Sequence, residues 1–251
     1  MKIKQELTKR TRLKHPKRVI IITLAALLLI ALGVYTFLSY QNWTTLQQRS
    51  QDATSSLKKA VDSSLGAESP AEDPAAQIDT IIAHFNKTYG TNPCDISNAY
   101  SWQTILPAIK EIKTNCATRS ATAIALIDTL KPLSQFLKDQ KSASALIAAN
   151  IEATKNPSDY AAAATLWQDT TKLSETASFK PVADKIKEVT ASISAAYAAL
   201  AAASKAEDKA AFDTAISAFQ TAYATIPNIN TVATETQTAL ITKAVEAYEK
   251  L

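Results

Sequence analysis

Residues Val19 to Leu38 read VIIITLAALLLIALGVYTFL and contain no charged side chain. A helix of this length rises about 30 Å at 1.5 Å per residue, which matches the hydrocarbon core of a bilayer. A block of lysines and arginines precedes the stretch, and the next charge after it is Arg49. These features predict a transmembrane helix over residues 19–39.

The charges around this helix predict its orientation. Short segments rich in Lys and Arg stay on the cytoplasmic side, so residues 1–18 are expected to form a cytoplasmic tail. The residues that follow the transmembrane helix, here called the exported part, are then expected to be extracellular or periplasmic. A cleaved signal peptide is the alternative, but its apolar core normally runs only about 7–15 residues. The one plausible cleavage site, Ala31-Leu32-Gly33, lies inside the apolar run. An uncleaved signal anchor of a single-pass integral membrane protein is the favoured interpretation.

The positive charge of the chain belongs mostly to this tail. The tail holds eight of the 27 basic residues and one of the 23 acidic residues, which leaves 19 against 22 and a net charge of −3 for the remainder. Nucleic-acid binding depends on a basic surface. The charge distribution therefore predicts that the exported part has no nucleic-acid partner.

Glycine is almost absent from the exported part, where Gly66 and Gly90 are the only two. Tight hairpins and phosphate-binding loops need glycine, whereas the abundant alanine favours helices. The composition predicts an all-α fold with a single N-terminal transmembrane helix, a stalk helix and an extracytoplasmic antiparallel helical bundle. The bundle is expected either as one unit or as two stacked helical subdomains.

Turn residues and apolar spacing divide the exported part. A polar helical stretch over residues 40–66 predicts the stalk, and the Pro-rich acidic residues 67–75 a linker. Residues 76–155 predict a helical subdomain with successive apolar faces, and Pro132 marks a kink. Residues 156–251 predict a helical-hairpin subdomain with heptad-like spacing. The apolar face of its last helix comprises Leu240, Ile241, Ala244, Val245, Tyr248 and Leu251.

The last hundred residues contain a weak internal similarity. Tyr160 and Trp167 match Phe212 and Phe219 at an offset of 52 residues. Two stacked helical hairpins of about fifty residues each would produce such a pattern. Any two alanine-rich amphipathic helices also align this well, so both interpretations remain open.

Cys94 and Cys116 are the two cysteines, and both lie in the exported part. An even number of cysteines in an exported chain indicates a disulfide, and two free thiols are the alternative. The bond requires the chain to fold back between them, and Pro107 is the expected interruption of a helix. A zinc site is not expected, because His84 is the only exported histidine and no CxxC motif occurs.

The sequence contains no catalytic constellation, and we expect no catalytic residue, no cofactor and no metal ligand. No motif is specific enough to indicate a family. We expect a non-enzymatic membrane-anchored module of the cell envelope that interacts with a protein or an envelope component. The alternative is a small-molecule-binding or sensory ectodomain, and an envelope hydrolase is a third possibility. The candidate groove residues are Trp102, Tyr160, Trp167, Phe212 and Phe219.

Overall fold

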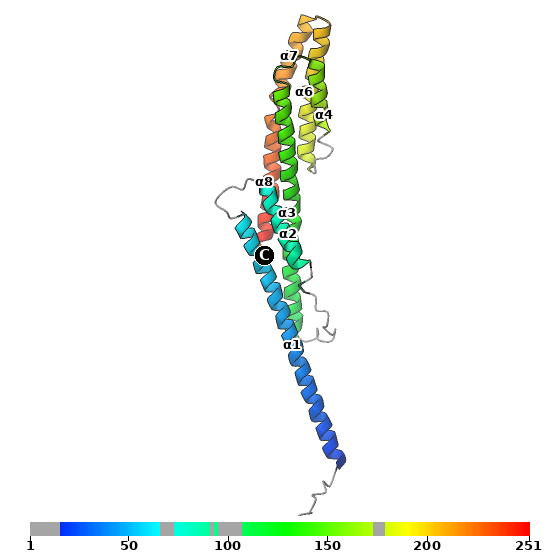
Figure 1. Cartoon of the computed structure of the whole chain (residues 1–251), viewed down its shortest axis with the longest axis vertical. Helices are drawn as coiled ribbons and strands as arrows, with labels where there is room; N and C mark the ends of the chain where they lie inside the picture. Colours follow the sequence, from blue (N-terminus) through cyan, green and yellow to red (C-terminus); the bar gives the residue numbers. More distant parts are fainter. Residues whose placement is uncertain (1–15, 66–72, 91–92, 95–106, 173–178) are drawn as a thin grey trace, which may run out of the picture.

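The computed structural model describes residues 16–65, 73–90, 93–94, 107–172 and 179–251. Every regular element in these ranges is an α-helix, so the prediction of an all-α chain is confirmed. The helices form an elongated rod that continues from the N-terminal helix (Figure 1). They are α1 (Pro16–Leu65), α2 (Pro74–Tyr89), α3 (Pro107–Ala153), α4 (Tyr160–Thr171), α6 (Lys180–Lys205), α7 (Lys209–Tyr223) and α8 (Pro227–Glu249).

Helix α1 runs without interruption through the apolar stretch and the predicted stalk. Its apolar part is exposed, as Leu29 at 70% illustrates, and it is the one described helix long and apolar enough to cross a membrane. Its second part is different, because Trp43 and Leu57 are buried at 3% and 0% exposure. One face of residues 40–65 is therefore packed into the bundle, which a free stalk would not show.

Helix α3 has 47 residues and joins apolar faces that the sequence presents as successive segments. Pro132 lies inside this helix without ending it. An internal proline removes a backbone hydrogen bond and clashes with the preceding turn. Its neighbours Leu130 and Leu133 are buried in the core, and this tertiary packing offsets the local cost. At 1.5 Å per residue α3 extends about 70 Å.

Among the described residues, the core consists of three clusters along the rod. The one nearest the apolar part of α1 joins Trp43 and Leu46 to Ile109, Ile112 and Cys116 of α3. The middle cluster draws on α1, α2, α3 and α8, and the far one on α3, α4, α6, α7 and α8. Helix α8 therefore packs with residues on both sides of the boundary predicted between residues 155 and 156. The clusters follow α3 rather than the two predicted subdomains.

The heptad-like spacing of α6 predicts its buried face correctly. All five of its apolar stripe positions are at most 5% exposed: Ile186, Val189, Ile193, Ala196 and Leu200. Helix α6 packs between α4 and α7 and also contacts α8. This central position explains why its apolar stripe is covered on both sides.

The chain reverses between α6 and α7 in a tight turn. Glu207 adopts a left-handed backbone with φ 52°, and the Asp208 N–H donates to the Ala203 carbonyl at 3.1 Å. The Asp208 side chain then accepts from the backbone N–H of Ala211 and caps α7. A Schellman motif thus ends α6, and the next residue is the N-cap of α7.

Helices α7 and α8 follow one another along the same line rather than pairing as a hairpin (Figure 1). The backbone at Ile226 is helical, with φ −51° and ψ −45°, and Pro227 begins α8 immediately after it. Helix α8 packs instead against α3 and α6. The segments that the internal similarity relates therefore differ in connectivity, since α4 and α6 are antiparallel neighbours whereas α7 and α8 are successive.

Candidate functional site

Of the predicted groove residues that the structure describes, Trp167 belongs to the far cluster, and Tyr160, Phe212 and Phe219 are partly buried against it. Trp102 falls outside the described residues. Trp167 is fully buried. Tyr160 and Phe212 pack edge to face with ring centroids 5.9 Å apart, and Phe219 packs against Tyr197 at 4.8 Å. The structure thus brings Tyr160 and Phe212 together. The Tyr160–Phe212 pair connects α4 with α7, and the Tyr197–Phe219 pair connects α6 with α7.

A buried polar network surrounds Trp167. Its indole N–H donates to the Thr154 hydroxyl at 3.1 Å, and the Tyr197 hydroxyl donates to the Thr154 carbonyl at 2.8 Å. The Asn150 amide donates to the Thr170 hydroxyl. Burial raises the pKa of Tyr197. Because these buried donors have acceptors, the network stabilises the far cluster and offers no free group to a ligand.

The disulfide predicted between Cys94 and Cys116 is present, with the two Cα atoms 5.8 Å apart. Cys116 is 1% exposed and packs with Trp43 and Leu46 of α1. The bond therefore ties the segment after α2 to α3, close to the apolar part of α1. The prediction that the chain folds back between the two cysteines is confirmed by this distance.

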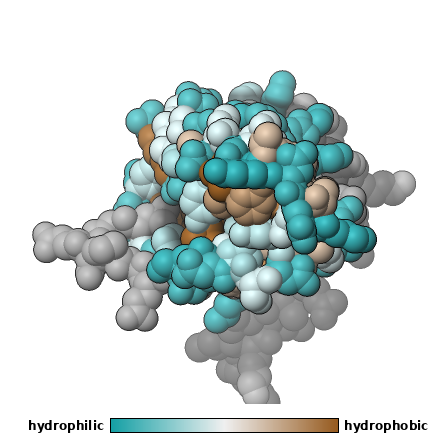
Figure 2. All heavy atoms as spheres, turned by 90° about the horizontal axis from the view of Figure 1, so that it is seen from above, coloured by the Kyte–Doolittle hydropathy of each residue, from teal (hydrophilic) through white to brown (hydrophobic). Residues whose placement is uncertain are grey.

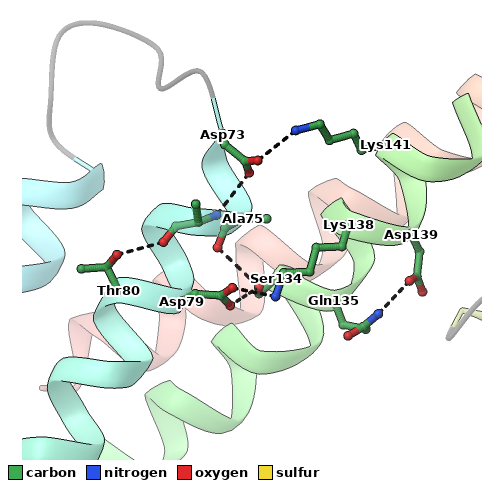
Figure 3. Close-up of polar contacts among 10 residues, drawn as sticks. Asp73, Ala75, Asp79, Thr80, Ser134, Gln135, Lys138, Asp139 and Lys141 are labelled. Carbon is green, nitrogen blue, oxygen red and sulfur yellow. Dashed lines mark hydrogen bonds and ion pairs between the residues drawn. The ribbon is translucent and has the colours of Figure 1, made fainter. Parts of the chain in front are cut away.

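A polar clamp holds α2 against α3 (Figure 3). Lys141 contacts the Asp73 carboxylate at 2.9 Å, and Lys138 contacts that of Asp79 at 2.6 Å. Ser134, itself buried, donates a hydrogen bond to Asp79 at 2.6 Å. The lysine hydrogen bonds hold the pKa of both carboxyls below the usual value. These charges neutralise each other, so the clamp is a structural feature.

His84 lies on α2, where its Nε2 is 2.9 Å from the Ser56 hydroxyl of α1. This contact joins the two helices beside the buried Leu57 and Ile81. Across the described residues, no three His, Cys, Asp or Glu side chains are placed so that they could hold a metal ion. We therefore assign His84 to the α1–α2 interface.

An apolar groove of about 570 Å³ opens between α1, α2, α3 and α8. Leu126, Leu130, Leu133 and Leu137 of α3 line it at helical spacing, so they share one face of that helix. Ile241 and Val245 of α8 line the facing wall. Its volume lies within the roughly 300–1,000 Å³ that ligand sites occupy. We name this feature the α3–α8 groove.

One end of the α3–α8 groove is polar. The Tyr248 hydroxyl donates to the Asp62 carboxylate, which raises the pKa of Tyr248. The Lys58 ammonium lies 5.3 Å from the centre of the Tyr248 ring, a cation–π distance. Gln237 marks the opposite end, eleven residues earlier on α8. The groove is thus aliphatic along its length and polar at its two ends.

Sequence reasoning did not identify the α3–α8 groove. The signal was present in the last helix, whose predicted apolar face is too wide for the neighbours it contacts. Ile241 and Val245 remain 43% and 49% exposed, although the spacing places them with the buried Ala244. No family model matches the chain, and neither a curated protein nor a solved structure shows detectable similarity to it.

Proposed function

We propose that the chain is a membrane-anchored, extracytoplasmic helical module of the cell envelope that binds a protein or an envelope component. One observation carries the proposal: the helix that offers an exposed apolar segment is the same helix that forms a wall of the bundle. Leu38 is 52% exposed, whereas Trp43, five residues later, is 3% exposed. The transition from candidate membrane span to packed bundle takes little more than one helical turn.

This continuity supports a rigid projection rather than a flexible tether. The cluster around Trp43 and Ile109 places the start of α3 beside α1, close to the end of the apolar segment. From there α3 rises about 70 Å. The turn between α6 and α7 then lies at the far tip, where hydrophilic side chains surround a smaller hydrophobic area (Figure 2). Such a tip is suited to contact a partner at a set distance from a membrane.

The location outside the cytoplasm has two supports. The basic tail favours a cytoplasmic N-terminus. The bond between Cys94 and Cys116 fits an oxidising compartment, because disulfides are rare in reducing cytosol. The proposal is non-enzymatic, since the described polar clusters at the clamp and around Trp167 serve packing between helices.

Orientation can be tested by cysteine labelling in intact cells. Lys243 is exposed on α8, so we expect Lys243→Cys to react with a membrane-impermeant maleimide. Lys9→Cys in the tail is the matched control and should react only after permeabilisation. Labelling of the tail cysteine alone in intact cells would show the opposite orientation. Equal protection of both cysteines would place the whole chain in the cytoplasm.

Partner binding can be tested by site-specific photo-crosslinking in cells. A photoreactive residue at Lys209, which is exposed at the tip, should give a discrete adduct, and the same residue at the exposed Lys59 should not. The adduct should disappear when the α6–α7 turn is replaced by an unrelated helical turn. Absence of an adduct at the tip, or identical adducts at both positions, would contradict projection of a binding surface.

A small-molecule receptor is the second candidate function. The α3–α8 groove favours it, whereas the fully buried Trp167 offers no surface for a ligand. A ligand that binds only the folded chain raises its thermal stability by mass action. Thermal-shift measurements on the full chain in detergent would distinguish a receptor, which responds to a ligand, from a scaffold, which does not.

A further inference from the structure

The α3–α8 groove is an incompletely covered part of the core. Leu126 and Leu130 on its floor are each 1% exposed, and they belong to the middle cluster. Ile241 and Val245 on its wall are about half exposed. Exposed aliphatic side chains beside a buried aliphatic floor leave apolar surface that a ligand could remove from water.

The dimensions of the groove favour a small ligand over a protein. From Leu126 to Leu137, and from Gln237 to Tyr248, each wall extends about 16 Å along its helix axis. Thirteen of the residues that the structure describes line the groove. A stable protein interface normally takes about 20–30 residues on each side. The groove is therefore too small for such an interface by itself, while its volume suits a ligand.

We propose that the α3–α8 groove binds the aliphatic chain of a lipid. The walls run parallel to the helix axes, so the site is linear, and its middle is lined by Leu, Ile and Val side chains. The polar Asp62–Tyr248 pair lies at one end, where a lipid headgroup can remain in water. Val61 and Asp62 of α1 also line the groove, about 35 Å along that helix from Leu38, so the site lies away from the candidate membrane span.

This inference rests on the second candidate function, for which it names the ligand class, and it requires no protein partner. The occupant is identified by its chemistry as an unbranched hydrocarbon chain. Each methylene group that enters an apolar site gains hydrophobic free energy. Affinity should therefore increase with chain length until the groove is filled.

The test is photolabelling of the full chain in lipid nanodiscs with palmitic acid that carries a terminal diazirine. In the native protein we expect labelled peptides from α3 and α8, in addition to background labelling of the apolar part of α1. Ile241→Asp places a carboxylate in the wall and should lower α8 labelling about tenfold, because an ion is costly to bury beside hydrocarbon. Background labelling of α1 should stay unchanged.

Two further variants keep the test decisive. Thr242→Asp adds the same charge at the adjacent exposed position outside the groove lining, and it should label like the native chain. Val245→Asp should reproduce the loss seen with Ile241→Asp. Circular dichroism checks that each variant remains helical, and since both wall residues are about half exposed, folding should persist.

Three results would overturn the proposal. Labelling confined to α1 would show that the groove does not take the probe. Equal α8 labelling in the native chain and in Ile241→Asp would show surface adsorption. A dimer, or a crosslinked protein partner, that Ile241→Asp abolishes would assign the groove to a helix of another chain. The labelling and tip-crosslinking experiments probe different surfaces, so either proposal can fail without the other.

Discussion

Replacing Leu57 with alanine tests whether the second half of α1 belongs to the bundle. Leu57 is 0% exposed and packs in the middle cluster with residues of α2, α3 and α8. A free stalk helix would expose this side chain to water on every face. The two arrangements therefore predict different effects of the same substitution on the free energy of unfolding.

The expected cost follows from complete burial. Truncation of a buried leucine to alanine removes its transfer free energy and leaves a cavity, which together cost about 2–5 kcal/mol. We expect about 3 kcal/mol for Leu57→Ala, because α1 packs against both α2 and α3, whose side chains cannot all move into the cavity. For a domain of this size each kcal/mol shifts Tm by about 2–4 °C, so Tm should fall by about 6–12 °C.

The measurement is thermal unfolding of the full chain in detergent, followed by far-ultraviolet circular dichroism. Lys59→Ala is the matched control, since Lys59 is exposed on the same helix. It should change the free energy of unfolding by less than about 0.5 kcal/mol. If Leu57→Ala shifted Tm no more than Lys59→Ala, α1 would not pack against the bundle and the rigid projection would be wrong.

Three other predictions follow from particular contacts. Glu207→Gly should raise the free energy of unfolding by about 1 kcal/mol, because Glu207 has a left-handed backbone that glycine adopts without strain. Chemical denaturation of the variant and of the native chain measures the difference. No gain in the free energy of unfolding would contradict the turn geometry. Cys116→Ser should lower the free energy of unfolding by about 3 kcal/mol, since the bond to Cys94 closes a loop with a sequence separation of 22 residues. Reduction of the native protein should have a similar effect. An unchanged Tm in both experiments would refute a stabilising role of the disulfide. The pKa of the Asp79 carboxyl is lowered in the folded chain, so its stabilising contribution is present above the unfolded pKa near 4 and is lost as pH falls through the folded pKa. Denaturation between pH 5 and 2 should therefore show a weaker acid destabilisation for Asp79→Asn than for the native chain, by no more than about 1 kcal/mol because the pair with Lys138 is half exposed. An identical pH profile for the two proteins would contradict the ion pair.

Several features could be predicted from sequence because they depend on local order. The 3.6-residue spacing identifies the buried face of α6, where Ile186 and Ile193 are almost inaccessible. Scarcity of glycine and abundance of alanine predict helices throughout, which the described residues show. The cysteine count predicts the Cys94–Cys116 bond. The length of the uncharged apolar stretch identifies the candidate membrane helix. Each of these inferences uses the composition of the chain or residues that are close in sequence.

The groove and the role of α1 required the tertiary structure. Spacing places Ile241, Val245 and Ala244 on one face of α8, but only contact with distant helices decides which of them are covered. Leu57 looks like one of the sparse apolar points of a polar stalk, and its burial depends on helices that come later in the chain. Pro132 predicts a kink locally, and α3 continues through it while the neighbouring side chains pack in the core.

The sequence by itself therefore determined the helices, their apolar faces, the disulfide and the candidate anchor. Tertiary structure alone decided that α1 is part of the bundle, that α7 and α8 are successive rather than paired, and that an apolar groove remains between α3 and α8. The physical reason is that helical periodicity is a property of residues three or four positions apart. Burial free energy is instead set by which surfaces meet across the fold.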